Sequence, residues 1–335
     1  MGGSAVERWV PGYAAARHYR RAWLRPDLAA GIVLAALLVP QGMAYAQLAG
    51  LPPITGLYTT VTALAAYATF GPSRRLVLGP DSALAPLIAA AILPLAAGDT
   101  GEAVALASML ALLTGVLCIL AGLFGLGTIT ELLSKPVRVG YLNGLALVML
   151  AGQVPVVFGF SVEADNVFGQ IAEFLRRVTE DTSGVTLAVG GTALVVMAVL
   201  SWRAPRVPGA LVVVIVGTVV VAALDLTTEG VAVVGSIPEG FPSPSLPSVD
   251  LDDMGSLTVA AVGIALVSFA DTSALSAGMR KEGGFTDDPN HEAVGLGAAN
   301  LLTGFFRGFP ISASTTRTVV ATSMGSKTQL TGLVG

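Results

Sequence analysis

The chain has 335 residues, of which 53% are hydrophobic and 12% are charged, and its mean hydropathy is +0.76. Soluble domains are about one quarter charged, so this composition excludes an ordinary soluble protein and indicates a polytopic membrane protein. The net charge of -4 provides no basic surface for nucleic acid, and the single cysteine, Cys118, excludes a disulfide framework and a cysteine-based metal site.

Apolar stretches follow one another along most of the chain, which predicts an all-α fold. The N-terminal residues 1–26 are polar and lack the apolar core of a signal peptide. The first apolar stretch is interrupted by Val39-Pro40-Gln41-Gly42, and an amphipathic stretch covers residues 163–181. The predicted apolar helices are 27–49, 53–70, 102–124, 136–157, 184–200, 208–224, 256–279 and 291–306.

Two further helices are too short to cross the roughly 30 Å of hydrocarbon in a bilayer. One follows Gly79-Pro80 and ends near Leu95, and the other follows Pro310. Both come after a basic residue, an extended segment, a proline and a hydroxyl side chain. Such paired, Gly/Pro-interrupted segments indicate an inverted-repeat transporter with a midplane site. We therefore predict a first repeat at 27–254 and the start of a second at 255–335.

The basic residues favour one orientation in the membrane. If the arginine-rich N-terminus is cytoplasmic, the connections on its side carry Arg74, Arg75, Lys135, Arg138, Arg203, Arg206, Arg280 and Lys281. The opposite connections hold only Arg176 and Arg177, beside Glu163, Asp165, Glu173, Glu180 and Asp181. Because cytoplasmic loops are enriched in Lys and Arg, we predict a multi-pass protein of the cell (inner) membrane with its N-terminus in the cytoplasm.

The stretch from Gly308 to Thr318 combines a proline, a run of hydroxyl side chains and Arg317 within an apolar sequence. Pro310 lacks an N–H group, so a helix can begin only after it, near Ser312 or Ser314. The first N–H groups of a helix that starts inside the membrane are unpaired and form an anion site. The stretch therefore predicts half of a substrate pocket in an anion transporter.

Three motifs closely resemble the SulP family of sulfate permeases, whose animal members form solute carrier family 26. Residues 40–53, PQGMAYAQLAGLPP, are similar to the family's first-helix signature, and residues 308–317 with 325–330 are similar to its tenth-helix signature. Residues 288–292 with 297–300 fit the loop and helix before the latter. The resemblance extends from about Leu24 to the end of the chain.

This resemblance implies a seven-plus-seven helix inverted repeat of the uracil-permease type, with a core domain that moves against a gate domain. It also implies a bacterial-type transporter, usually a homodimer, with no cofactor. We expect the second repeat to be incomplete here and the cytoplasmic STAS domain common in the family to lie outside this chain.

The resemblance also implies the substrate-binding residues. They are Gln41, Tyr45, Ser82, Ala313, Ser314, Thr315, Thr316 and Arg317. Gln41 and Tyr45 share one helix face, although a kinked packing surface would also explain them. Arg317 either adds positive potential to the anion site or pairs with a carboxylate, and both roles can coexist.

Each of the acidic residues Asp81 and Asp271 has two possible roles. Asp81 would cap the first short helix or contact the substrate, and we favour the cap because a carboxylate competes with an anion. Asp271 corresponds to an acid that in many bacterial relatives is associated with coupling to a proton or sodium ion. The alternative for Asp271 is a structural ion pair, for which Arg317 is the available partner.

Several functions compete. Secondary transport of sulfate, bicarbonate or a dicarboxylate is the first, and an uncoupled anion channel or exchanger is the second. Transport of a neutral nucleobase fits Arg317 poorly. An intramembrane enzyme is the weakest, because His18 and His291 are the only histidines and show no metal-ligand or Ser-His spacing.

Overall fold

The computed structural model describes residues 10–127, 135–162, 164, 166–204, 207, 209–235, 238–283 and 288–335. The chain divides into two compact units, Met1–Ser134 with Pro238–Gly335 and Lys135–Ile237. Glu163, Asp165 and Arg206, which contribute to the predicted orientation, lie outside the described residues.

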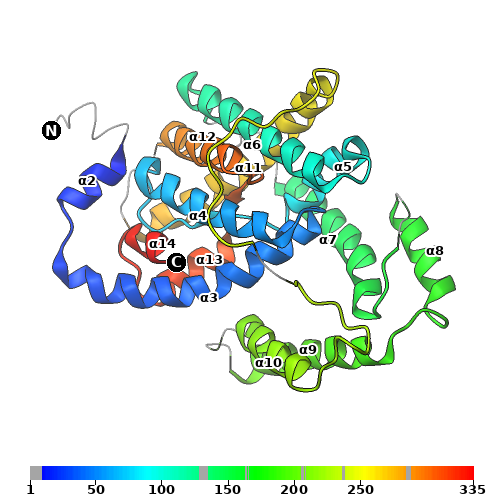
Figure 1. The fold of residues 1–335 in the computed structure, drawn as a ribbon. Coiled ribbons are helices and arrows are strands. Elements are labelled where there is room, and N and C mark those ends of the chain that lie inside the picture. The colour runs from blue at the N-terminus through cyan, green and yellow to red at the C-terminus, as the bar shows by residue number, and fades with distance from the viewer. Residues whose placement is uncertain are drawn as a thin grey trace. The chain divides into compact units, whose positions relative to one another are not determined.

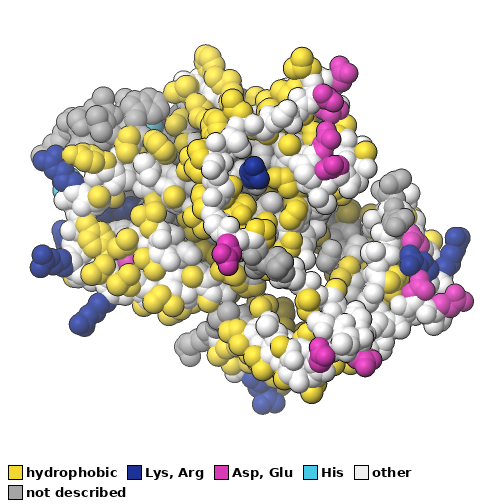
Figure 2. Space-filling view, in the orientation of Figure 1, with side chains coloured by type: hydrophobic (Ala, Val, Ile, Leu, Met, Phe, Trp, Pro, Cys, Tyr) yellow, Lys and Arg dark blue, Asp and Glu magenta, His cyan; other side chains and the backbone are white. Residues whose placement is uncertain are grey.

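The larger unit is helical, apart from one short strand pairing in its described residues (Figure 1). Its helices are α2 (Pro11–Arg17), a 3-10 turn (Arg21–Trp23), α3 (Leu24–Leu48), α4 (Pro53–Phe70), α5 (Ala85–Ala96), α6 (Thr100–Leu123), α11 (Met254–Gly283), α12 (Pro289–Phe305), α13 (Thr315–Ser323) and α14 (Leu330–Val334). Hydrophobic side chains cover much of its visible surface in Figure 2, with few charged side chains among them.

Helix lengths agree with a membrane protein. In the described part of the chain, four helices are long and apolar enough to cross a bilayer: Arg21–Leu48, Thr100–Leu123, Gly184–Arg203 and Met254–Ser276. The helix predicted at 27–49 is observed as α3, which continues through Pro40. A proline removes one N–H bond but is tolerated in membrane helices, where neighbouring groups satisfy the freed carbonyl.

The two short helices, α5 and α13, are confirmed, and the strands before them meet. Strand β1 (Leu78–Gly79) pairs antiparallel with β2 (Ser312–Ala313), and Leu78 lies opposite Ala313. The antiparallel pairing means that the two extended segments approach it from opposite sides. Pro80 directly follows β1 whereas Pro310 precedes β2, so the two prolines are not equivalent positions. Each lies where its missing N–H interrupts no strand bond.

Side chains from surrounding helices hydrogen-bond the extended segment before α13. Thr59 of α4 accepts from the Phe309 N–H at 3.1 Å, and Asn300 of α12 accepts from the Ile311 N–H at 3.0 Å. On α11, Ser268 donates to the Ile311 carbonyl at 2.6 Å. Extended backbone at membrane depth is tolerated only when its polar groups are satisfied in this way.

Helices α6 and α12 approach each other through glycines. A Cβ atom on Gly297 would lie 2.6 Å from the Gly115 carbonyl oxygen, and one on Gly115 would lie 2.8 Å from the Gly297 carbonyl oxygen. Small residues allow such close backbone packing between membrane helices. Because α12 leads directly into the extended segment, this contact helps to fix β2.

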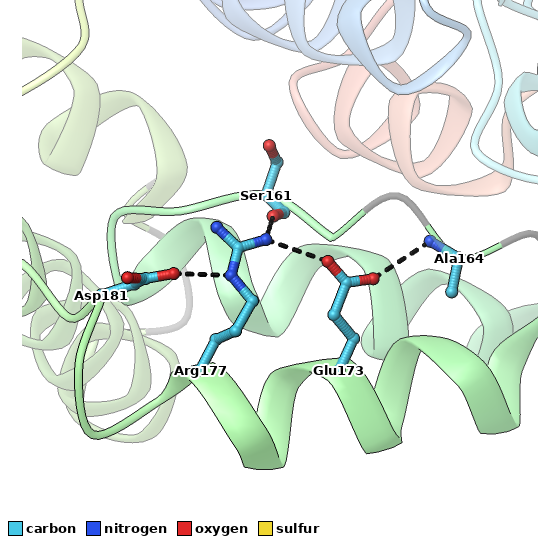
Figure 3. Close-up of polar contacts among 5 residues, drawn as sticks. All are labelled: Ser161, Ala164, Glu173, Arg177 and Asp181. Carbon is cyan, nitrogen blue, oxygen red and sulfur yellow. Dashed lines mark hydrogen bonds and ion pairs between the residues drawn. The ribbon is translucent and has the colours of Figure 1, made fainter.

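The smaller unit comprises α7 (Lys135–Val157), α8 (Val167–Arg177), α9 (Gly184–Arg203) and α10 (Gly209–Ala223). Helix α8 lies within the predicted amphipathic stretch, and its Phe168 side chain is 85% exposed. Figure 3 shows Arg177 between Asp181 and Glu173, at 2.5 and 2.9 Å, with Ser161 accepting a further bond at 3.1 Å. Hydrogen bonding to Asp181 and then to Glu173 raises the pKa of Arg177. These bonds tie the polar face of α8 to its flanking loops.

The α6–α12 contact yields a first prediction. Gly297→Ala places a methyl group against the backbone of α6, which cannot move away as a flexible side chain could. We therefore expect the free energy of unfolding of the purified full-length protein to fall by about 1–3 kcal/mol, with a lower melting temperature. Gly263→Ala on α11 is the matched control, because nothing lies within 4 Å of its added Cβ. Equal melting temperatures for the two variants would contradict this packing.

Candidate functional site

The N-terminus of α13, which follows β2 closely, has exposed side chains and, within the described residues, free backbone N–H groups. Ser314 is its N-cap, and its hydroxyl accepts from the Arg317 N–H at 3.5 Å. The Ser314 N–H donates to the Val77 carbonyl at 3.1 Å. The side chains of Thr315 and Thr316 are exposed, and their N–H groups have no hydrogen-bond partner in the described part of the chain. Two backbone donors at the positive end of the helix are thus available to an anion.

Arg317 lies in the first turn of α13 and is only 1% exposed. None of its three guanidinium nitrogens has a hydrogen-bond partner among the described residues. The guanidinium lies against β1, since a Cβ on Gly79 would be 2.7 Å from Nη1. Gly79 also has φ +152°, a value that favours glycine. The backbone at Gly79 therefore makes room for a buried cation whose donors are all unfilled.

The N-terminus of α5 is preceded by a turn that Asp81 stabilises. Its carboxylate accepts from the Ala83 N–H at 2.9 Å, and its carbonyl accepts from Leu84 and Ala85 at 3.2 and 3.1 Å. Asp81 thus caps this turn, but the favoured role as cap of the helix is wrong, because α5 begins at Ala85 with Leu84 as its N-cap and has no side-chain cap hydrogen bond from the described residues. Asp81 also interacts electrostatically with Arg317. The two short helices thus differ, because a side chain caps α13 and none of the described side chains caps α5.

Helix α3 supplies the predicted residues Gln41 and Tyr45, both half-buried. Tyr45 lies beside Ser82 and within electrostatic reach of Asp81 and Arg317. The structure therefore brings Tyr45, Ser82 and Arg317 together from three separate segments. It gives Gln41 a place on the same helix face but no hydrogen bond to the others within the described residues.

Ala313 and Asp271 fit the predicted roles less directly. Ala313 is buried in β2, and its N–H donates to the hydroxyl of Thr272 at 3.2 Å, so that donor is engaged. Asp271 is the half-buried neighbour of Thr272 on α11. Among the described residues, no hydrogen bond joins the Arg317 guanidinium to Asp271. The coupling role of Asp271 stays a prediction.

Sequence reasoning missed Asp27, which ties α14 and the loop before it to α3. Its carboxylate is fully buried and accepts from the N–H groups of Lys327 and Thr328 at 2.7 and 3.2 Å. Hydroxyl groups of Thr328, Thr331 and Tyr19 donate at 2.6, 3.2 and 3.2 Å. Asp27 follows a proline at the start of an apolar run, so it looks like an ordinary first-turn acid.

A second buried acid was part of a quoted motif but had no predicted role. Glu292 on α12 is 1% exposed, accepts from the Tyr67 hydroxyl and lies 3.4 Å from the Ser276 hydroxyl. It joins α12 to α4 and α11. In the described residues, no group of three His, Cys, Asp or Glu side chains could hold a metal ion.

The family follows from comparison with known sequences. A profile of the Sulfate permease family matches residues 24–335. The chain belongs to the sulfate permease family. A probable sulfate transporter of Mycobacterium tuberculosis is 41% identical over 326 residues, covering 97% of this chain and 58% of that protein. Human solute carrier family 26 member 6 is 31% identical over 349 residues, covering 97% of this chain and 45% of that protein. The chain thus spans about half the length of these relatives.

Solved structures share the fold. The murine solute carrier 26 family member A9 anion transporter, in its inward-facing state, gives a TM-score of 0.92 at 23% identity, over all of this chain and 59% of that one. The transmembrane domain of the cyanobacterial bicarbonate transporter BicA gives 0.83 at 24% identity, over 95% of this chain and 81% of that one. This chain therefore has the predicted inverted-repeat fold of a multi-pass membrane protein.

The charge of Asp81 leads to a second prediction. Asp81→Asn keeps an oxygen that can cap Ala83 but removes a negative charge near Arg317. We expect sulfate to bind the full-length protein about tenfold more tightly at neutral pH, from about 1–2 kcal/mol less like-charge repulsion. Equilibrium binding of radiolabelled sulfate measures this, with the exposed Asp250→Asn as control. Weaker binding by Asp81→Asn would instead indicate direct contact between Asp81 and the anion.

Proposed function

We propose that this chain is the membrane part of a secondary active transporter for a small anion such as sulfate, bicarbonate or a dicarboxylate. The observation that carries the proposal is the buried, unpartnered Arg317 next to the open N-terminus of α13. A buried cation without a partner is expensive, and a bound oxyanion would supply the missing acceptors. The names of the relatives support sulfate as the first substrate to test.

The anion would bind between Ser314, Thr315, Thr316 and Arg317 on one side and Ser82 on the other, with Gln41 and Tyr45 of α3 closing the pocket. Contacts from α3 would select the ligand by its size and its capacity for hydrogen bonding. The Ala313 backbone would support this geometry through its bond to Thr272.

Transport would follow alternating access. The division into two compact units suits a core that carries the site and a gate against which it moves. We place the N-terminus in the cytoplasm of a bacterial cell and the protein in its inner membrane as a homodimer, from the basic residues and the resemblance. Asp271 would couple anion movement to a proton or sodium gradient.

An uncoupled anion channel or exchanger is the second candidate. The open positive end of α13 would serve it equally well, because both functions need an anion site at mid-membrane. Gradient dependence separates the two, since a symporter needs its coupling ion and a channel does not.

The site itself is tested by Arg317→Ala. Removing the only buried guanidinium at the site should weaken equilibrium binding of sulfate to the full-length protein at least about 100-fold, at 1.4 kcal/mol per factor of ten. Arg21→Ala, at an exposed position in the N-terminal segment, should bind as the wild type does. Wild-type affinity in a folded Arg317→Ala protein would remove the central claim.

Coupling is tested by uptake into proteoliposomes. Sulfate, bicarbonate and fumarate would be offered to the full-length protein with and without an inward proton or sodium gradient. We expect one anion to accumulate only with a gradient, and Asp271→Asn to abolish that accumulation while keeping anion binding. Uptake that is indifferent to both the gradient and the substitution would favour the uncoupled channel or exchanger.

A further inference from the structure

A second cavity lies beside the same short helix, beyond Arg317. It has a volume of about 470 Å³ and is bounded by α11, α13 and the segment that leads into β1. Leu275 and Met279 form part of the α11 wall, Thr322 and Ser323 part of the α13 wall, and Arg75 lies at the third side. The cavity has no part in the candidate site described above.

Arg75 is the cationic group of this cavity. It is half-buried, and its Nε atom is fully enclosed without a hydrogen-bond partner among the described residues. It forms no ion pair with any described carboxylate. A guanidinium that lines a cavity without a carboxylate partner favours a ligand that brings acceptor oxygens, and an oxyanion brings both acceptors and charge.

The two hydroxyl side chains of the α13 wall bond their own helix: Thr322 donates to the Thr318 carbonyl at 2.7 Å and Ser323 to the Val320 carbonyl at 2.8 Å. Arg75 is therefore the charged donor among the residues that line the cavity. In the sequence, Arg74 precedes Arg75. Asp271, a turn before Leu275, is the acid nearest in sequence to the lining of α11.

Helix α13 lines this cavity and also carries Arg317 of the candidate site. Thr318, which lines the cavity, follows Arg317 directly and accepts from the Val77 N–H at 3.1 Å. Val77 and Arg75 belong to the same extended segment before β1. A ligand at Arg75 would therefore lie beside the C-terminal half of α13.

We propose that Arg75 holds a second oxyanion in this cavity, as a station on the path to or from the candidate site. The station role rests on the proposed transport function. The binding chemistry does not, because the phosphate of an anionic lipid offers the same acceptor oxygens, with Leu275 and Met279 as an apolar wall for its chain.

Binding of radiolabelled sulfate to the purified full-length protein tests the station. Arg317→Gln should leave a weaker residual affinity, and adding Arg75→Gln should reduce that residual binding at least tenfold. Arg75→Lys should keep most of it, and Arg74→Gln, which removes a neighbouring charge outside the cavity lining, should leave it unchanged. Melting temperatures would establish that each variant is folded.

The lipid source is tested in nanodiscs that contain phosphatidylglycerol or phosphatidylcholine. If a lipid phosphate is the ligand, native mass spectrometry should find phosphatidylglycerol retained by the wild type and by Arg74→Gln but lost from Arg75→Gln. If Arg75→Gln loses either sulfate or phosphatidylglycerol, the oxyanion site is supported, and the ligand that is lost shows whether the oxyanion is free or part of a lipid. If Arg75→Gln changes neither, the inference is overturned, while absence of any sulfate binding to the wild type would count against the proposed function alone.

Discussion

The whole site depends on keeping extended backbone satisfied in a place where lipid offers no hydrogen bonds. Strands β1 and β2 satisfy part of each other's backbone, and the rest is met by single polar side chains on otherwise apolar helices. Thr59, Ser268, Thr272 and Asn300 each bond one short stretch around Ile311. The polar residues of α4, α11 and α12 thus hold the point at which α13 can begin, and the position of Arg317 follows from it.

The two short helices contribute unequally to the site. Asp81 lies in the turn before α5, where its carboxylate and carbonyl accept from Ala83, Leu84 and Ala85, and its charge lies near Arg317. In the proposed site, the open N–H groups of α13 and the guanidinium of Arg317 would provide positive potential. An anion bound there would share Arg317 with Asp81, so its affinity would depend on the balance between one cation and one fixed acid.

Local signals in the sequence were sufficient to predict helices near the candidate site. Pro310 and the hydroxyl run predicted where α13 begins, and the structure places its N-cap at Ser314. The helix predicted at 27–49 is also observed, and α3 continues through Pro40 because a proline in a membrane helix costs one bond that tertiary context can absorb. Hydropathy therefore located this helix, and proline and hydroxyl residues located the start of α13.

Contacts between distant segments could not be predicted in the same way. Asp27 accepts from Lys327 and Thr328 across about 300 residues, and nothing in either local pattern marks the other as its partner. The same holds for Asn300 and Ile311, because an asparagine in a helix looks the same whether it faces lipid, a neighbour or an extended strand. The family resemblance supplied the fold but not these pairings, which depend on three-dimensional register.

The close approach of Arg317 to Gly79 explains how a guanidinium finds room at this buried position. Because the residue at 79 has no side chain, the guanidinium can lie against the strand backbone while its N–H groups stay unfilled. A guanidinium and backbone N–H groups recognise charge and oxygen acceptors but distinguish poorly between small oxyanions. In the proposed site, discrimination between sulfate and bicarbonate would then arise from the residues on the other side, where α3 places Tyr45 beside Ser82. Under this proposal, anion binding and anion selection would be carried by different helices.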